Sequence, residues 1–445
     1  MSLISTLTML GKAGSGSGVS YWVNEAHISR SYGWSSSLGR IAVSSDHVVM
    51  FGKEQVENSY TGSAILVYDQ DGSQLSTKLF WNNSGQSASD RTEPTSAMYD
   101  ETTDRFYTPN YGPAGSSQLS RWQMGSNDLL SSNYCKSGGG TNDTFPSNIT
   151  STASNEVSYF SRGVLPSSTW NSTVYNVAYK SSGSHVKRYV IGNTNYNYYP
   201  SCGAFEQYNS TPTYGYLGFY FYQSGLKGGV TKFNLSNGST EWGRRLQYDD
   251  GYGSSYSGRL NAVCPDDSGN VLCGFDFSGG NNPLVLLNSS GSVVWSRSSD
   301  SEIIRIDWDN VNDRWVILTA YRMKLEFIYP NGTTAQGLEV NISGLDMNTN
   351  NSDVKYDFVN NIAWIFGHRN SDYKYIVKRP LDSSLDGTYG SYTLATTNSG
   401  IGTSWTSGYS WNNVSMTGYS DTVSTTSMSI NQLTNYVSTT KTDLG

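Results

Sequence analysis

The stretch NSSGSVVWSRS, residues 288–298, places a polar glycine turn before a strand-like segment that carries a tryptophan. A second strand-like segment, the apolar run PLVLLN at 283–288, comes directly before the turn. Asn, Ser and Gly between two such runs are typical of a β-hairpin. The stretch therefore predicts a hairpin that ends in a Trp-bearing strand.

The same turn recurs along the chain at intervals of roughly 40 to 60 residues, which is the range of propeller blades. Its glycines are Gly72, Gly125, Gly183, Gly238, Gly291, Gly332 and Gly387. A second turn recurs in phase with the first, as YDETTDRF at 99–106, WDNVNDRW at 308–315 and, more loosely, YDFVNNIA at 356–363. Two independent signals in phase indicate one repeating unit.

Each unit contains four short runs of β-branched and aromatic residues joined by polar turns, and helical periodicity is nearly absent. A single four-stranded meander cannot bury both of its faces, whereas seven of them arranged radially shelter one another. We therefore predict an all-β fold, a seven-bladed β-propeller of four-stranded antiparallel blades. The repeat spans 39–396 within a propeller domain of residues 19–399.

The two ends of the chain lie outside this repeat. In residues 1–18, Leu3, Ile4, Leu7 and Leu10 fall on one helical face and are followed by a Gly/Ser tether, which predicts a short anchoring peg. The Ser/Thr-rich extension at 400–445 has no clear core pattern, and it could pack on the ring, help to close it, or reach a neighbour. Residues 20–24 could equally supply a closing strand.

Composition excludes several partners. Charged residues make up only 15% of the 445 residues, and the net charge is -7 with no cluster of Lys and Arg, which argues against nucleic acid. No apolar run approaches the length of a membrane span, and the N-terminal run lacks a preceding basic residue, so we expect no membrane partner and no secretory signal. We expect Cys264 and Cys273 to be buried reduced thiols, facing each other only if their strands are neighbours.

The search for catalytic chemistry predicts neither a catalytic residue nor a metal site. The four histidines lie in no HExxH, GxSxG or Cys/His setting, and His47 and His185 fall at strand starts, where a structural role is expected. Aspartates in two turns could bind calcium, although an ordinary Asx turn explains both sets. These are Asp307, Asp309 and Asp313, and Asp69 with Asp71.

The spacing Gly-x-x-x-Trp occurs at Gly238 and Trp242 and again at Gly291 and Trp295. It resembles the blade motif of quinoprotein-like propellers, and we expect Trp295 to cover the side of its own sheet. The rest of that motif is missing, so the resemblance implies no quinone, and we predict no cofactor.

The long, varied loops lie on one face of the predicted ring, and they are rich in Tyr, Ser, Gly and Asn. Such residues are favoured at recognition surfaces, because aromatic rings give large contact area at low entropic cost. We predict that six aromatic residues line a face that contacts a glycan or a partner protein, with packing among the loops as the alternative. They are Trp170, Tyr196, Tyr198, Tyr199, Tyr252 and Tyr256.

The start MSLISTLTMLGKAGSG, residues 1–16, and the Ser/Gly/Asn/Tyr-rich blades resemble structural proteins of tailed bacteriophages, particularly marine ones. The resemblance implies a tail, fibre or appendage component that is present in several copies and bound to other virion proteins through the peg. It implies assembly in the host cytoplasm, exposure outside the cell and a role in host attachment. The alternatives are an extracellular polysaccharide-acting propeller enzyme, with the central channel as its cleft, and a self-assembling surface or fibre protein.

Overall fold

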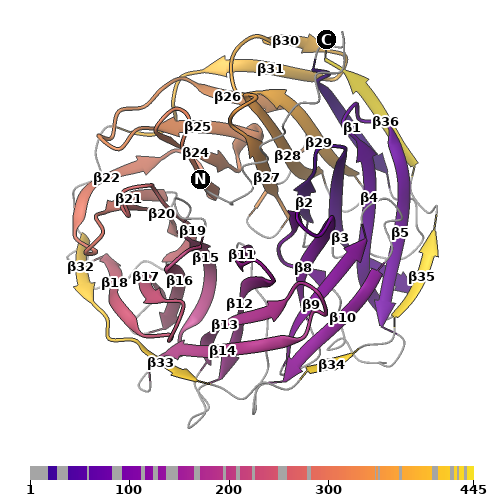
Figure 1. Cartoon of the computed structure of the whole chain (residues 1–445). Coiled ribbons are helices and arrows are strands. Elements are labelled where there is room, and N and C mark those ends of the chain that lie inside the picture. The colour runs from indigo at the N-terminus through magenta and orange to yellow at the C-terminus, as the bar shows by residue number, and fades with distance from the viewer. Residues whose placement is uncertain are drawn as a thin grey trace.

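The computed structural model of the chain describes most of the sequence. The described residues are 19–27, 39–57, 60–82, 93–111, 116–123, 129–136, 149–164, 171–193, 197–206, 211–222, 226–248, 258–277, 282–345, 347–348, 351–369, 373–402, 409–420, 425–427, 430–434 and 438–444. They form seven antiparallel sheets arranged as a ring (Figure 1), together with one 3₁₀ turn, η1 (Tyr321–Met323). The predicted seven-bladed β-propeller is confirmed.

Blades 1 to 4 follow one another along the chain, and each starts with its innermost strand. Blade 1 contains β2 (Gly39–Val43), β3 (His47–Glu57), β4 (Tyr60–Asp69) and β5 (Gln74–Asn82). Blade 2 contains β6 (Glu93–Pro94), β7 (Met98–Asp100), β8 (Arg105–Tyr111), β9 (Ser116–Gln123) and β10 (Leu129–Lys136). Blade 3 contains β11 (Thr150–Ala153), β12 (Glu156–Val164), β13 (Asn171–Tyr179) and β14 (His185–Gly192). Blade 4 contains β15 (Tyr199–Phe205), β16 (Tyr214–Tyr222), β17 (Leu226–Asn234) and β18 (Thr240–Tyr248).

Blades 5 and 6 repeat this order, and blade 7 departs from it. Blade 5 contains β19 (Gly258–Pro265), β20 (Val271–Phe277), β21 (Asn282–Leu287) and β22 (Val293–Ser299). Blade 6 contains β23 (Ile303–Asp309), β24 (Arg314–Thr319), β25 (Lys324–Ile328) and β26 (Gly337–Asn341). Blade 7 contains β27 (Asp353–Asp357), β28 (Ile362–Arg369) and β29 (Tyr373–Pro380), and its fourth strand is β1 (Trp22–His27) from the other end of the chain.

Strand β1 closes the ring. It pairs antiparallel with β29, with Trp22 opposite Lys378 and His27 opposite Tyr373. Of the two segments that the sequence left open for closing the ring, the one around residues 20–24 supplies the closing strand. The assignment of Gly387 to a seventh blade turn is wrong, because blade 7 takes its last strand from the N-terminal segment and has no hairpin there.

The two recurring turns are confirmed where the structure describes them. Gly291 has a φ of 78°, a left-handed conformation that glycine adopts without a Cβ penalty, and the turn glycines of blades 1, 3, 4 and 6 share it. In the second turn the left-handed residue is Asp104, Asp313 or Asn361. Asp309 accepts hydrogen bonds from two backbone N–H groups of its own turn, so the Asx-turn explanation holds for it. Gly125 lies outside the described residues.

Aromatic side chains join each of several blades to the next. The Trp242 indole N–H of blade 4 donates to the Ser289 carbonyl of blade 5 at 3.0 Å, and a Cβ on Gly291 would lie 2.9 Å from the indole ring. Among the described residues the same kind of hydrogen bond occurs three more times, with the acceptor two residues before the turn glycine in each case. These contacts are Trp22 to Gln70, Tyr189 to Ser236 and Trp295 to Pro330. Trp295 thus reaches across to the next blade, which corrects the expectation that it covers its own sheet.

The C-terminal segment runs around the outside of the ring. We call residues 387–443 the belt, and Figure 1 shows its later strands in yellow along the rim. Its strands extend blades 6, 4, 3, 2, 1 and 7 in that order. They are β30 (Gly387–Tyr389) with β31 (Tyr392–Thr397), β32 (Tyr409–Asn413), β33 (Thr417–Ser420), β34 (Thr425–Ser427), β35 (Ile430–Thr434) and β36 (Ser438–Asp443). Blade 5 has only an isolated bridge, between Ser299 and Ile401, among the described residues.

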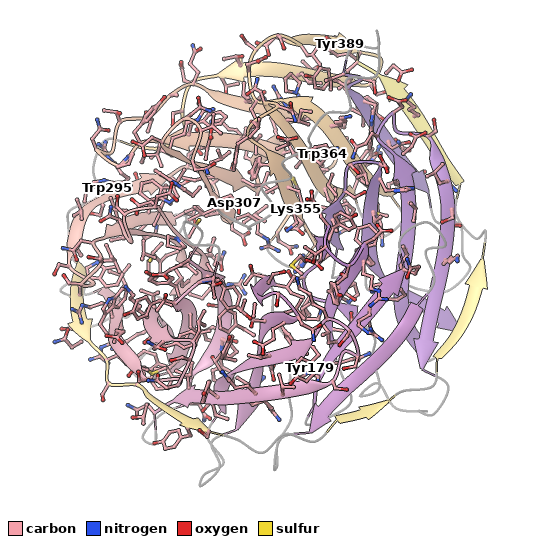
Figure 2. All side chains as sticks on the ribbon, in the orientation of Figure 1. Tyr179, Trp295, Asp307, Lys355, Trp364 and Tyr389 are labelled. Atoms are coloured by element: carbon pink, nitrogen blue, oxygen red, sulfur yellow. The ribbon has the colours of Figure 1, made fainter. Side chains whose placement is uncertain are left out.

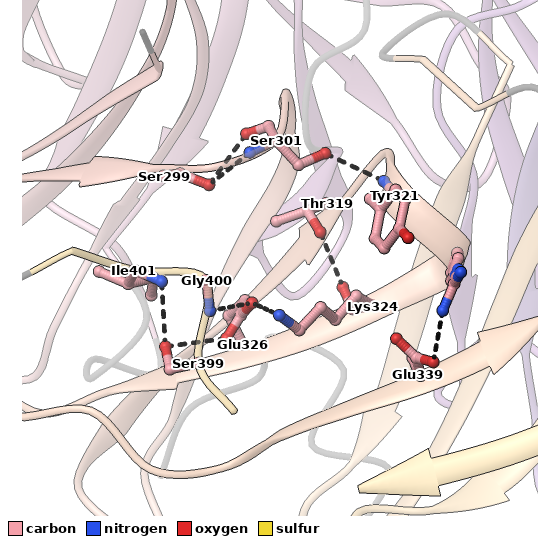
Figure 3. A network of polar contacts seen from close by, with 11 residues as sticks. Ser299, Ser301, Thr319, Tyr321, Lys324, Glu326, Glu339, Ser399, Gly400 and Ile401 are labelled. Atoms are coloured by element: carbon pink, nitrogen blue, oxygen red, sulfur yellow. Dashed lines mark hydrogen bonds and ion pairs between the residues drawn. The ribbon is translucent and has the colours of Figure 1, made fainter. Parts of the chain in front are cut away.

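A buried carboxylate holds the start of the belt (Figure 3). Glu326, fully buried on β25, forms an ion pair with Lys324 at 2.6 Å and accepts hydrogen bonds from the Ser399 hydroxyl and the Gly400 N–H. The Asp300 N–H donates in turn to the Gly400 carbonyl at 3.0 Å. These contacts lead the chain from blade 6 toward blade 5, where the belt continues around the rim. Of the three roles left open for the C-terminal extension, packing on the ring is the one observed.

The cysteines behave as predicted. Cys264 and Cys273 lie on the neighbouring strands β19 and β20, but Cys273 stands opposite Val263, so the two side chains are staggered by one position and project to opposite faces. Both are free and buried, as is Cys202. Among the described residues no helix is long and apolar enough to cross a membrane.

Candidate functional site

Charged side chains gather on the innermost strands of blades 6, 7 and 1. Arg305 on β23 donates to Asp353 on β27 at 3.1 Å, and the other oxygen of Asp353 accepts the Ile41 N–H from β2 at 3.2 Å. Arg40 on β2 donates to the Thr95 carbonyl and to the Ser352 carbonyl next to Asp353. One carboxylate therefore links three blades, and two guanidinium groups surround it.

A local irregularity in β23 places Arg305 in this position. The pairing of β23 with β24 shifts between Ile303 and Arg305, so that Ile304 is an extra, bulged residue. The inner strands of blades 4 and 5 shift at the corresponding place, whereas those of blades 1 and 7 pair without a break. A bulge turns the following side chains, and such features occur often beside functional sites.

Asp307 on β23 and Lys355 on β27 form a second pair of opposite charges (Figure 2). Each lies two residues after the charged residue of the first pair on its strand. Both side chains are half-buried, and Figure 2 shows both toward the middle of the ring. Among the described residues they do not form the direct ion pair that Arg305 and Asp353 form. Burial raises the pKa of Asp307 to about 7, even though Lys355 attracts its charged form.

The two carboxyl groups have opposite electrostatic settings. Burial alone would raise the pKa of Asp353, but Lys355, Arg305 and Arg40 outweigh it and lower that pKa. Burial, together with Arg305, lowers the pKa of Arg40 to about 9. Near neutral pH the site therefore contains one carboxylate that stays ionised and one carboxyl that exchanges a proton. Such a set can both donate and accept hydrogen bonds to a polar ligand.

We call Arg40, Arg305, Asp307, Asp353 and Lys355 the inner charge cluster. Most of its members lie near the starts of the inner strands, which is the end that the connections between blades reach in an up-and-down blade. It therefore belongs to the face that the sequence predicts to carry the long loops. Among the described residues no group of three or more His, Cys, Asp and Glu side chains is placed to hold a metal ion.

The structure describes two of the six predicted contact residues. Tyr198 is 2% exposed and packs against Phe219 and Phe221, so its ring fills the core between blades 3 and 4 rather than facing a ligand. Tyr199 is half-buried, stacks on Tyr220 and lies under the Arg162 guanidinium. The other four lie outside the described residues, as do the peg residues Leu3, Ile4, Leu7 and Leu10. They are Trp170, Tyr196, Tyr252 and Tyr256.

Of the two histidines at strand starts, His185 has the hydrogen-bonded structural role that the sequence predicts for both. His185 begins β14 and hydrogen-bonds through Nε2 to the Tyr159 hydroxyl. Its burial lowers the pKa to about 3, so the ring is neutral at physiological pH. His368 is also buried and contacts the Asn351 amide at 3.1 Å.

Sequence reasoning missed the inner charge cluster because its members are far apart in the chain. Arg40 and Asp353 belong to opposite ends of the repeat, so no local spacing relates them. One signal was available: Arg305, Asp307, Asp353 and Lys355 occupy alternate positions of predicted inner strands, where uncharged residues are the norm in a buried strand.

No protein-family model matches this sequence, and no curated protein matches it. Solved structures with a similar fold include a chain of the "Mitotic Checkpoint Complex", at 10% identity and TM-score 0.45, with coverage of 77% of this chain and 89% of that chain. A periplasmic gluconolactonase of Pseudomonas aeruginosa matches at 11% identity and TM-score 0.43, with coverage of 71% and 95%. The β-propeller domain of the Trilobed protease from Pyrococcus furiosus matches at 8% identity and TM-score 0.43, with coverage of 78% of this chain and 98% of that chain.

Proposed function

We propose that this protein is a non-enzymatic structural component of a bacteriophage virion, in the tail or in a fibre or appendage. Its ring presents the face with the long loops to a partner protein or to a glycan of the host surface. The peg at Leu3 to Leu10 attaches it to other virion proteins. The proposal rests on one observation above all, namely that most of the inner charge cluster lies near the starts of the inner strands, at the end of the ring where the sequence predicts the long loops.

Two further features support a binding role. The belt and β1 incorporate both ends of the described chain into the ring, which gives a closed scaffold for loops that must keep their positions. Few formal charges and many Ser, Asn, Thr and Tyr residues give a surface that hydrogen-bonds without strong electrostatic attraction.

Labelling of intact particles tests the proposal. Antibodies raised against residues 39–396 should decorate purified virions at the tail or an appendage, and mass spectrometry of the same particles should detect the chain. Deletion of residues 2–12 should leave a folded ring that no longer joins the particle. Absence of the chain from the particles, or normal incorporation of the truncated chain, would contradict the proposal.

A second candidate function is hydrolysis of polysaccharide within the ring, and the inner charge cluster favours it. A carboxyl with a pKa of about 7 beside a carboxylate that stays ionised is the pair that glycoside hydrolysis requires. Release of reducing sugar from host polysaccharide by the full chain, and its loss in Asp307→Asn, would establish this candidate. No release by the unmodified chain would remove it.

A further inference from the structure

A groove of about 590 Å³ opens on the rim where blades 4 and 5 meet. Four parts of the chain form it: Lys232 of β17, the start of β18, the glycine turn of blade 5, and the belt from the last residue of β32 onward. Its volume falls within the range of small-ligand sites. Because the belt supplies one wall, the groove exists only when the C-terminal segment is in place.

Trp242 forms a fixed aromatic surface in this groove. Its indole N–H is bonded to the Ser289 carbonyl, and its ring rests against Gly291. Arg244 braces the same place, because its nitrogens donate to the carbonyls of Gly243, Ser290 and Gly291. A ring held from several sides loses little entropy when a ligand covers it.

Polar side chains of both signs line the groove beside the tryptophan. Glu241 is the extra residue of a bulge between β17 and β18, and its side chain is exposed. Lys232 stands opposite Trp242 and lies over the Tyr214 ring at 4.1 Å. Asn413 and Ser415 of the belt are exposed on the other wall. Within the described part of the chain, the side chains of Glu241, Asn413 and Ser415 make no hydrogen bond.

This combination matches the chemistry of a sugar chain. An aromatic surface packs against the C–H face of a pyranose ring, while a carboxylate, an amide and a hydroxyl bond its hydroxyl groups. The two cations of the lining are already engaged, Lys232 over the Tyr214 ring and Arg244 with backbone carbonyls, and Glu241 repels an acidic ligand, so the groove favours an uncharged one. We propose that this groove binds a neutral oligosaccharide segment of an extended glycan.

The inference goes beyond the proposed function, since the groove lies at the glycine turn of blade 5, at the opposite end of the strands from the predicted long-loop face. The ring can be a virion component without this site, and binding by the isolated chain does not depend on the particle. If the glycan test fails, the virion proposal still stands or falls on the labelling experiment. If the labelling fails, the proposal that the groove binds a glycan is unaffected.

The test uses the full chain on a printed array of neutral glucans, mannans and galactans of five or more residues, followed by titration of the strongest. We expect binding to at least one of them, weakened about tenfold by Glu241→Ala and by Asn413→Ala. Trp242→Phe should weaken it as well, whereas Trp295→Phe, which removes the equivalent indole bond one blade further on, should not. Absence of binding to every glycan, or an equal loss in Trp295→Phe, would overturn the proposal.

Discussion

The inner wall and the outer rim of this ring are stabilised in different ways. At the wall, buried side chains with charge link neighbouring blades, as in the contacts of Asp353 with Arg305 and with the Ile41 N–H. At the rim, the blades are linked by backbone pairing of their outer strands with the belt, as between Arg244 and Asn413 and along the rest of β32. The comparison shows that the wall depends on the identities of a few residues, whereas the rim depends on the presence of a strand.

Removal of the part of the belt that follows residue 408 should have the largest effect. A chain that ends at residue 408 loses β32 to β36 and exposes the outer edges of five blades. We expect it to aggregate or to lose roughly 5 kcal/mol or more of unfolding free energy, because each net backbone hydrogen bond contributes about 1 kcal/mol. Urea denaturation measures this, and an unchanged midpoint would show that the belt does not hold the rim.

At the wall, Asp353→Asn should be the most harmful single substitution. It keeps the shape of the side chain but leaves Arg40 and Arg305 close together without their carboxylate. Removing one partner of a buried ion pair costs about 3 to 5 kcal/mol. The matched rim variant is Lys441→Met, which breaks the ion pair with Asp443, exposed at 69%. That variant should change stability by about 0 to 1 kcal/mol, and equal losses in the two variants would remove the distinction between wall and rim.

Gly291→Ala should cost about 3 kcal/mol, because it adds a left-handed strain of roughly 1 to 3 kcal/mol and also pushes a methyl group into the Trp242 ring. Gly390→Ala is the control. Gly390 has a φ of 62°, but a Cβ there meets nothing within 4 Å, so only the strain remains. Thermal unfolding of the two variants isolates the contribution of the contact between blades, and equal losses would show that this contact contributes nothing.

Asp307→Asn should change how stability depends on pH. A carboxyl whose pKa rises on folding binds its proton more tightly in the folded state, so it makes the protein less stable as pH rises from about 4 to about 7. The variant should lack this decline. Its free energy of unfolding should gain about 2 kcal/mol over that of the unmodified chain between pH 4 and pH 8, a figure reduced for the partial exposure of the side chain. Denaturation midpoints across this range provide the measurement, and parallel curves for the two proteins would contradict the assignment.

The sequence predicted the parts of the fold that repeat. Glycine turns such as Gly238 and the turn with Asp313 carry local signals, because only certain residues adopt left-handed backbone. Blade 7 was assigned incorrectly because the segment at Gly387 has the same composition as a blade turn, and composition does not reveal that β1 already occupies the fourth position.

The belt and the candidate sites left weaker traces in the sequence. Belt strands such as β34 are polar throughout, so they lack the alternation that identifies a half-buried strand. The inner charge cluster and the rim groove join residues from distant parts of the chain, such as Glu241 with Ser415, and no spacing links them. Tyr198 was chosen for its aromatic ring, but composition alone does not distinguish a ring that faces solvent from one that packs in a blade.

A disulfide between the belt and blade 4 is the most direct test that the C-terminal segment of the same chain packs along the rim. Arg245 and Asn412 stand directly opposite each other in β18 and β32, where a pair of cysteines lies within bridging distance. The variant Arg245→Cys/Asn412→Cys should form an intramolecular disulfide in dilute monomer, with each single variant as a control. A lack of crosslinking, or crosslinks only between chains, would contradict this account of the rim.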